Sequence, residues 1–160
     1  MRSFTCLAAL LFAVSLPLHA APGAVEVKSV AEMDVVVVNA KGVKETKRQP
    51  VEKAVPGDVV IYTTTYKNLI AKPVGNIAIT NPVPSETTYQ GGSASGANTD
   101  IAFSVDGGKT WGTPDTLRIT GKDGKERAAL PAEYTHIRWT YRGELPAGKS
   151  GSVSFRAVIK

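Results

Sequence analysis

The sequence has almost no residues that form disulfides or bind transition metals. It contains one cysteine, Cys6, and two histidines, His19 and His136. Cys6 and His19 both lie within the first twenty residues, so residues 21–160 contain a single histidine and no cysteine. A disulfide framework, a zinc centre and a catalytic cysteine are therefore excluded for that part, and its stability must come from burial and sheet hydrogen bonds.

The sequence also lacks a second long apolar run. Its one such stretch, Leu7–Leu18, follows the positive charge of Arg2, which is the order found in a cleaved secretory signal. A membrane-spanning helix needs about 20 apolar residues, and this run is shorter. We expect residues 1–20 to be a signal peptide, with a cut one residue later as the alternative. The protein is then exported to the periplasm, or to the outside or cell surface, without a transmembrane segment.

The composition is otherwise that of an ordinary globular domain. Hydrophobic residues make up 42% of the chain and charged residues 21%, which argues against wholesale disorder and against a polytopic membrane protein. The length after signal removal suits one domain with a core of its own. We therefore expect residues 21–160 to form a single domain.

Charge of one sign is only mildly in excess. Residues 21–160 carry 18 Lys and Arg, since Arg2 is the one basic residue before them, against 14 Asp and Glu, giving +4. Part of this excess is concentrated at Lys44, Lys47 and Arg48. The simpler interpretation is a solvated edge strand or loop protected by lysines, and the alternative is a surface that binds anionic envelope polymers. Export makes nucleic acid an unlikely partner.

Strand patterns dominate the rest of the chain. Period-2 alternation, β-branched residues and turn signals recur about every ten residues, and no stretch of a dozen residues has a helical stripe. Eleven strands are predicted: Ala24–Lys28, Asp34–Ala40, Val43–Val51, Asp58–Lys67, Val74–Asn81, Thr87–Gly91, Ile101–Val105, Thr116–Thr120, Lys125–Ala129, Tyr134–Tyr141 and Gly151–Ile159. The fold class expected from this count is all-β, an antiparallel two-sheet sandwich.

Alternation also predicts which side chains face the core. In Tyr134–Tyr141 the inward face carries Ile137, Trp139 and Tyr141. In the last strand the same argument points Val153, Phe155, Ala157 and Ile159 inward. The polar tract between Gln90 and Asp100 is expected to be a mobile loop.

Turn and strand motifs from Val55 onward resemble a known family. They are Val55-Pro-Gly-Asp58 before a tyrosine-bearing strand, Asn68, the strand ending at Asn81-Pro-Val-Pro84, Glu86-Thr-Thr-Tyr89, and the closing turn Leu145–Phe155. This arrangement resembles the bacterial conserved-repeat domain catalogued as unknown-function family eleven, over about residues 55–159. Asn81 stands where that family usually has aspartate. The resemblance implies an immunoglobulin-like sandwich on an exported or surface protein, with no agreed biochemical activity.

The polar residues in those motifs have structural explanations of their own. Pro56-Gly57 presets a tight turn that Asp58 can close through the backbone, and Asn68 can end its strand in the same way. The prolines after Asn81 remove backbone donors, so that segment cannot be central in a sheet. We therefore predict structural roles for Asp58, Asn68 and Asn81.

The most distinctive short motif runs from Ser104 to Trp111. Its Ser, Asp, Gly and Trp spacing resembles the Asp-box turn of secreted β proteins, in which Asp106 bonds turn amides and Trp111 packs back on the hairpin. One copy is too few for a propeller hydrolase. The motif is predicted to be a turn, with Trp111 as the side chain through which it could touch a sugar.

No catalytic constellation is evident. His136 lies between Thr135 and Ile137 with no nucleophile motif, so an exposed strand histidine is expected rather than a base. No catalytic, cofactor-binding or metal residues are assigned and no cofactor is expected, although an adventitious calcium site among Asp100, Asp106 and Asp115 is left open.

The sequence thus predicts a non-enzymatic module that acts in binding or structural assembly at the cell envelope. Its partner is expected to be another envelope protein or an envelope polymer, reached by strand addition at Val43–Val51 or at the terminal strand ending at Ile159. The candidate binding residues are Lys44, Lys47, Arg48, Asp106 and Trp111. The alternative function is a carbohydrate-binding or carbohydrate-active protein that uses the Asp106/Trp111 loop.

Overall fold

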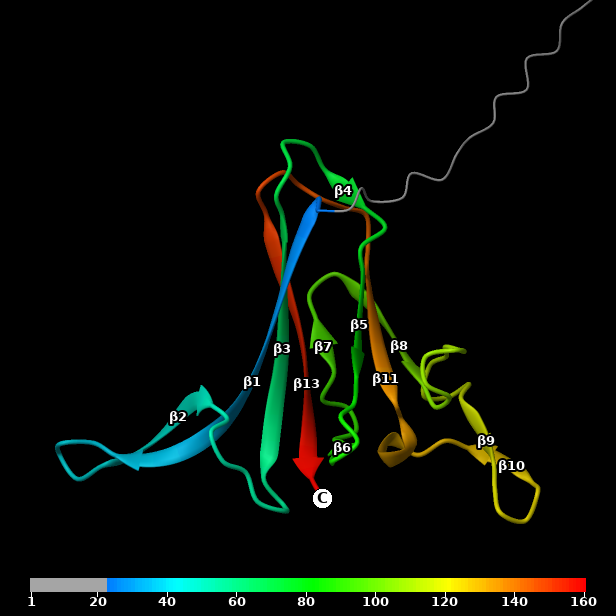
Figure 1. Ribbon diagram of the computed structural model, residues 1–160, viewed down its shortest axis with the longest axis horizontal. Coiled ribbons are helices and arrows are strands. Elements are labelled where there is room, and N and C mark those ends of the chain that lie inside the picture. Colours follow the sequence, from blue (N-terminus) through cyan, green and yellow to red (C-terminus); the bar gives the residue numbers. More distant parts are fainter. Residues whose placement is uncertain (1–22) are drawn as a thin grey trace, which may run out of the picture.

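The computed structural model describes residues 23–160, so the predicted signal peptide, residues 1–20, lies outside the described residues. Strands form four antiparallel sheets, and a 3-10 turn, η1 (Pro131–Glu133), is the helical element among the described residues (Figure 1). The all-β prediction is confirmed. Within this part of the chain, no helix is long and apolar enough to cross a membrane.

The larger sheet is built from the two ends of the described chain and its middle. Its order is β2 (Lys44–Pro50), β1 (Val25–Val38), β3 (Val59–Asn68), β13 (Ser150–Ile159), β6 (Thr87–Tyr89), with β7 (Ser95–Gly96) also pairing with β13. Each neighbouring pair is antiparallel.

The second sheet lies across from the first and is narrower. Its order is β5 (Ala78–Pro82), β11 (His136–Tyr141), β8 (Thr99–Ser104). Two small two-stranded sheets complete the fold: β4 (Val74–Gly75) with β12 (Glu144–Leu145), and β9 (Arg118–Thr120) with β10 (Glu126–Ala128). In Figure 1 the two larger sheets approach each other near β4 and spread apart toward β6.

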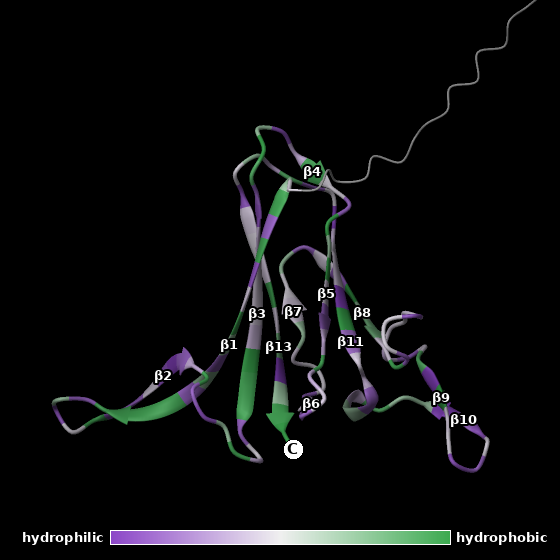
Figure 2. Ribbon diagram, in the orientation of Figure 1, coloured by the Kyte–Doolittle hydropathy of each residue, from purple (hydrophilic) through white to green (hydrophobic). Residues whose placement is uncertain are grey.

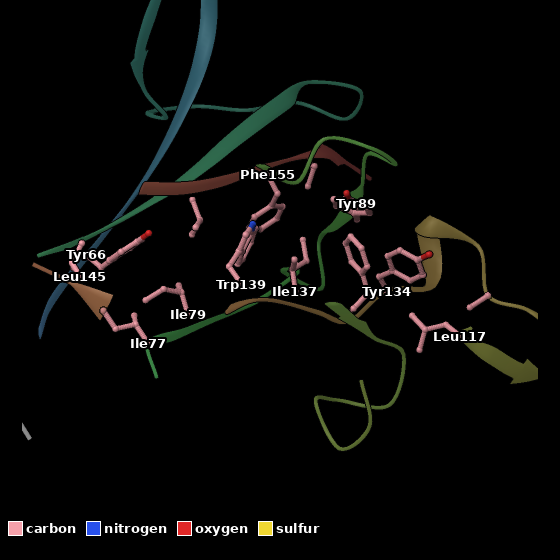
Figure 3. Packing of buried hydrophobic residues seen from close by; sticks show 14 of the residues in the cluster. Tyr66, Ile77, Ile79, Tyr89, Leu117, Tyr134, Ile137, Trp139, Leu145 and Phe155 are labelled. Atoms are coloured by element: carbon pink, nitrogen blue, oxygen red, sulfur yellow. The ribbon is translucent and has the colours of Figure 1, made fainter. Parts of the chain in front are cut away.

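The hydrophobic core fills the space between the two larger sheets. Figure 3 shows Trp139 and Ile137 from β11 meeting Phe155 from β13, and none of the three is more than 1% exposed. The ring of Phe155 also stacks on Tyr62 at 4.9 Å between centroids. Strand alternation therefore predicted the inward faces of β11 and β13 correctly, because each of these strands has one side against the core.

Several predicted strand boundaries are wrong in instructive ways. Ala24–Lys28 and Asp34–Ala40 belong to one 14-residue strand, β1. Val74–Asn81 is split into β4 and β5 near Asn76, whose φ of 55° lies in the left-handed region and breaks an extended strand. The tract predicted to be a mobile loop, between Gln90 and Asp100, includes β7 and hydrogen-bonds to β13.

The terminal strand is not an available edge. β13 lies inside the larger sheet, with β3 on one side and β6 and β7 on the other. The prediction of strand addition at the strand ending at Ile159 is therefore wrong, because both rows of its backbone groups are already used in pairing. The other predicted edge, β2, does lie at the border of the sheet.

The polar residues of the family-like motifs have structural roles, as predicted. The Asp58 carboxylate accepts a hydrogen bond from the Val55 amide at 2.8 Å. Asn68 is fully buried and donates to the carbonyls of Lys72 and Leu145 at 2.8 and 2.9 Å. Asn81 on β5 donates to Thr64 Oγ1 on β3 at 2.8 Å, which links the two larger sheets.

Candidate functional site: the β1–β2 arm

β1 extends well beyond the body of the sandwich. Its pairing with β3 ends at Glu32↔Ile61, whereas its pairing with β2 continues to Val38↔Lys44. The outer part is a two-stranded ribbon, Asp34–Val38 paired with Lys44–Arg48, which projects from the larger sheet in Figure 1. We call this ribbon and its connecting turn, residues 34–48, the arm.

Local interactions explain why this segment forms a hairpin. At its tip, the Asn39 side-chain oxygen accepts hydrogen bonds from the amides of Lys41 and Val43 at 2.9 and 3.1 Å, and Gly42 takes a φ of 78°. At its base, Arg48 donates to both carboxylate oxygens of Asp34 at 2.9 and 3.3 Å. This hydrogen bond, with the positive charge behind it, lowers the pKa of Asp34. The two ends together fix the register of the ribbon.

The arm exposes apolar side chains to solvent. Val36 is 66% exposed, Val38 63% and Val43 55%. The hydropathy colouring in Figure 2 shows this outer part of β1 as a continuous hydrophobic stretch. A two-stranded ribbon in water is marginally stable at best, and exposed apolar groups of this kind mark contact surfaces. The arm is therefore the surface of this fold that most needs a partner.

The predicted basic residues all lie on the arm but do not form one patch. Lys44, Lys47 and Arg48 are all on β2, every residue of which is exposed. Lys44 and Arg48 share a ribbon face with Val36 and Val38, while Lys47 lies on the opposite face. Arg48 is bound to Asp34, and Lys47 Nζ lies 3.9 Å from Glu45 Oε2, so two of the three predicted cations have an acidic neighbour on the arm.

Sequence reasoning missed the residues that most distinguish this site. The strand pattern predicts Val35–Val38 only as part of a strand, and the charge pattern indicates the lysines beside it as the binding residues. The available signal was the loss of alternation: four valines in succession place apolar side chains on both faces of the strand, which only a partner on each face would cover.

The Asp106 turn is confirmed as a structural motif. The Asp106 carboxylate accepts hydrogen bonds from the amides of Lys109 and Thr110 at 3.0 and 2.9 Å, and from the hydroxyls of Thr110 and Ser104 at 2.6 and 2.7 Å. These bonds, first among them those from Thr110, hold the pKa of Asp106 far below its ordinary value. The carboxylate is thus fully occupied by its own loop.

Trp111 packs back on the strands, as the motif predicts. The guanidinium carbon of Arg138 lies 3.8 Å from the centre of the Trp111 ring, in a cation–π contact. The His136 ring meets the same indole edge-on at 6.5 Å between centroids. The indole is half-buried, and one of its faces is covered by Arg138.

The three aspartates considered for calcium do not come together. Asp100 lies near the start of β8 and is paired with Arg142, whereas Asp106 follows the end of that strand. Among residues 23–160, no group of three or more His, Cys, Asp or Glu side chains is placed to hold a metal ion.

One apolar hollow of about 430 Å³ lies away from the arm. It is lined by Tyr89, Gly91, Gly92, Ala94, Ile101, Phe103, Pro114, Pro131 and Tyr134. This lining contains no charged side chain and no acid–base pair, so the hollow offers surface for contact rather than chemistry.

Comparisons with protein-family models, with curated proteins and with solved structures find no match to this chain.

Proposed function

We propose that the protein is an exported, immunoglobulin-like, non-enzymatic domain that acts in binding or structural assembly at the cell envelope, and that its arm is the binding element. The observation that carries this proposal is the projection of β1 and β2 beyond the sandwich with their valines in solvent. A hairpin of this kind is costly to keep exposed, and strand addition is a common way to cover one.

Other features support the immunoglobulin-like identity and the exported location. Two facing antiparallel sheets with an aromatic core suit that architecture. Asp58, Asn68 and Asn81, which stand in the family-like motifs, hold turns or link the two larger sheets. The order of Arg2 and the apolar run after it supports export. Lys44 and Lys47 would attract a partner or polymer of negative charge.

The carbohydrate alternative has no comparable observation behind it. Asp106 is occupied by the amides and hydroxyls of its own turn, and the Trp111 ring is stacked against Arg138. Neither group is poised to hold a sugar or to transfer a proton to one.

An arm-less variant tests the proposal. In it, Asn-Gly replaces Asp34–Arg48, so that the paired residues Met33 and Gln49 close a short hairpin with a tight turn. We expect the variant to remain folded, by circular dichroism and thermal melting, and to lose retention on the envelope fraction of the producing cell. Retention equal to that of the unmodified protein would remove the arm as the binding element.

A further inference from the structure

One edge of the arm is not protected by charge. β2 borders the arm on one side with three basic residues and ends at Pro50. On the other side, β1 runs past the end of β3, and among residues 23–160 no strand pairs with Asp34–Val38 there. The residues at that free edge are one aspartate and four valines. Long apolar edges of this kind recruit another strand.

Hydrogen-bond alternation identifies the unpaired backbone groups. The Asn39 amide donates to the Val43 carbonyl at 2.9 Å and the Val51 amide to the Ala31 carbonyl at 3.1 Å, so odd-numbered residues of β1 face β2. In an antiparallel ladder successive residues point their backbone groups to opposite sides. The N–H and C=O groups of Asp34, Val36 and Val38 therefore point toward the free edge.

This edge is complementary to a second copy of itself. A twofold axis at Val36 pairs Val36 with Val36 of the second copy, Val35 with Val37, and Asp34 with Val38. Every hydrogen-bonding residue of one edge then meets a hydrogen-bonding residue of the other, and no pair brings like charges together. Two marginal ribbons become one four-stranded sheet with the valines in its two central strands, which is more than the three strands that independent stability needs.

The same register also determines where the connecting turn of the second arm lies. Continued past Val38, it brings Asn39 of the second copy beside Met33 at the base of the first arm. That base has a hollow of about 260 Å³, lined by Met33, Asp34, Gly57, Asp58, Val59, Ile61 and Arg156. The connecting turn of one arm can thus lie against the body of the other molecule.

The charges on β2 then limit the assembly to two copies. In the four-stranded sheet the two β2 strands are the outer strands, about 14 Å apart at about 4.8 Å per spacing. That separation exceeds the Debye length of about 8 Å at physiological salt, so their lysines repel one another little. Outward-facing lysines and Pro50 discourage a further strand.

We propose that the free edge of β1, residues Asp34–Val38, pairs antiparallel with the same edge of a second copy of this chain, about a twofold axis at Val36. The proposal rests on the proposed function of the arm and names its occupant. In this assembly the basic β2 strand also ends the sheet, and its lysines stay exposed at the two outer edges.

Sedimentation equilibrium on the full chain tests this pairing. We expect the unmodified protein to be a dimer at micromolar concentration. Val36→Lys places two ammonium groups face to face on the axis and should raise the dimer dissociation constant at least about a hundredfold. Val36→Pro removes the amide that faces the free edge while sparing the bonds to β2, and should have the same effect. Thr46→Lys, at the position opposite Val36 on β2, is the matched control and should remain dimeric.

Three results would overturn the pairing: an unmodified protein that is monomeric, dimers that persist in both Val36 variants, or a Thr46→Lys variant that dissociates as well. The two proposals can also fail separately. If the unmodified protein is a monomer and the arm-less variant still loses envelope retention, the arm binds a strand of another protein and the self-pairing is overturned.

Cross-linking adds a second readout in a Cys6→Ser background. There Val36→Cys should form a disulfide-linked pair under mild oxidation and Thr46→Cys should not, because paired Cα atoms about 5.5 Å apart suit a disulfide.

Discussion

At the scale of single residues, Asn68 shows how a polar side chain is accommodated in the core. It is fully buried, donates to two carbonyls, and accepts from the Ile70 amide at 3.0 Å. One of those carbonyls, on Leu145, lies 77 positions away in the sequence. The side chain therefore closes a turn and also holds β12 against the end of β3.

Removing that amide should be costly. Asn68→Ala leaves the buried Leu145 carbonyl and two part-buried groups, the Lys72 carbonyl and the Ile70 amide, without this partner, and we expect the free energy of unfolding to fall by about 3 kcal/mol. Denaturation in urea, monitored by circular dichroism, measures this loss. Asn39→Ala removes a similar set of bonds from the solvent-exposed turn of the arm and serves as the control. It should cost less than about 1 kcal/mol, because water replaces the lost partner. Equal losses for the two variants would contradict the role assigned to Asn68.

Glu133 predicts a pH dependence of stability. Hydrogen bonds from Arg127 and from the Leu130 amide lower the pKa of Glu133 to about 2. Because the folded pKa lies below the unfolded one, near 4.5, the stabilisation is complete above that value and is lost as the pH falls toward 2. The melting temperature of the unmodified protein should therefore drop more steeply than that of Glu133→Gln over this interval. Parallel curves would show that the carboxylate contributes nothing to folding.

At the scale of elements, β13 and β3 meet at a position that only glycine can occupy. Gly151 lies opposite Tyr66, whose ring is buried. A Cβ atom on Gly151 would stand 2.3 Å from Tyr66 Oη and 2.4 Å from its Cζ. The strand pair can close over the aromatic ring only because this side chain is missing.

Gly151→Ala should consequently destabilise the sheet. Moving a buried tyrosine ring or the strand beside it costs about 1 to 3 kcal/mol, which calorimetry would detect as a lower melting temperature. Gly75→Ala is the control, since its added Cβ would lie no closer than 3.5 Å to a neighbouring atom. If Gly75→Ala lowers the melting temperature more than Gly151→Ala does, the steric role assigned to Gly151 is wrong.

The exposed lysines of the arm lead to a separate prediction about retention on the envelope fraction. Lys44→Glu with Lys47→Glu reverses two exposed charges while sparing the Arg48–Asp34 ion pair. If the envelope partner is anionic, retention on the envelope fraction at low salt should fall at least about tenfold, with stability unchanged. Lys122→Glu with Lys125→Glu makes the same change of charge between β9 and β10 and should leave retention intact. A similar loss in both variants would mean that net charge, rather than the arm, governs retention.

At the scale of the whole molecule, the sequence predicted what depends on local pattern. Alternation placed Ile137, Trp139 and Phe155 in the core, and turn chemistry explained Asp58, Asn68 and Asp106, because these features involve a few neighbouring residues. Sheet order is a long-range property, so the sequence pattern predicts an edge position for β13 although the strand is central. The two-residue strands β7 and β12 were missed because so short a segment has no periodicity.

The candidate site was predicted in part for the same reason. Lys44 and Lys47 indicate an exposed strand, because the charges that mark an edge strand lie within one short segment of the sequence. β1 extends beyond the point where its pairing with β3 ends. No local sequence pattern indicates this point, because it depends on two strands that are distant in the sequence. The unpaired valine edge of β1 can therefore be identified only from the strand pairing in the structure.

The central place of β13 also bears on the timing of folding. β13 is the last of the described strands along the chain, yet β6 and β7 pair with it alone in the larger sheet, and β3 has it as one of two neighbours. A nascent chain cannot complete its larger sheet until residues 150–159 have been released, so β6 and β7 stay unpaired until then.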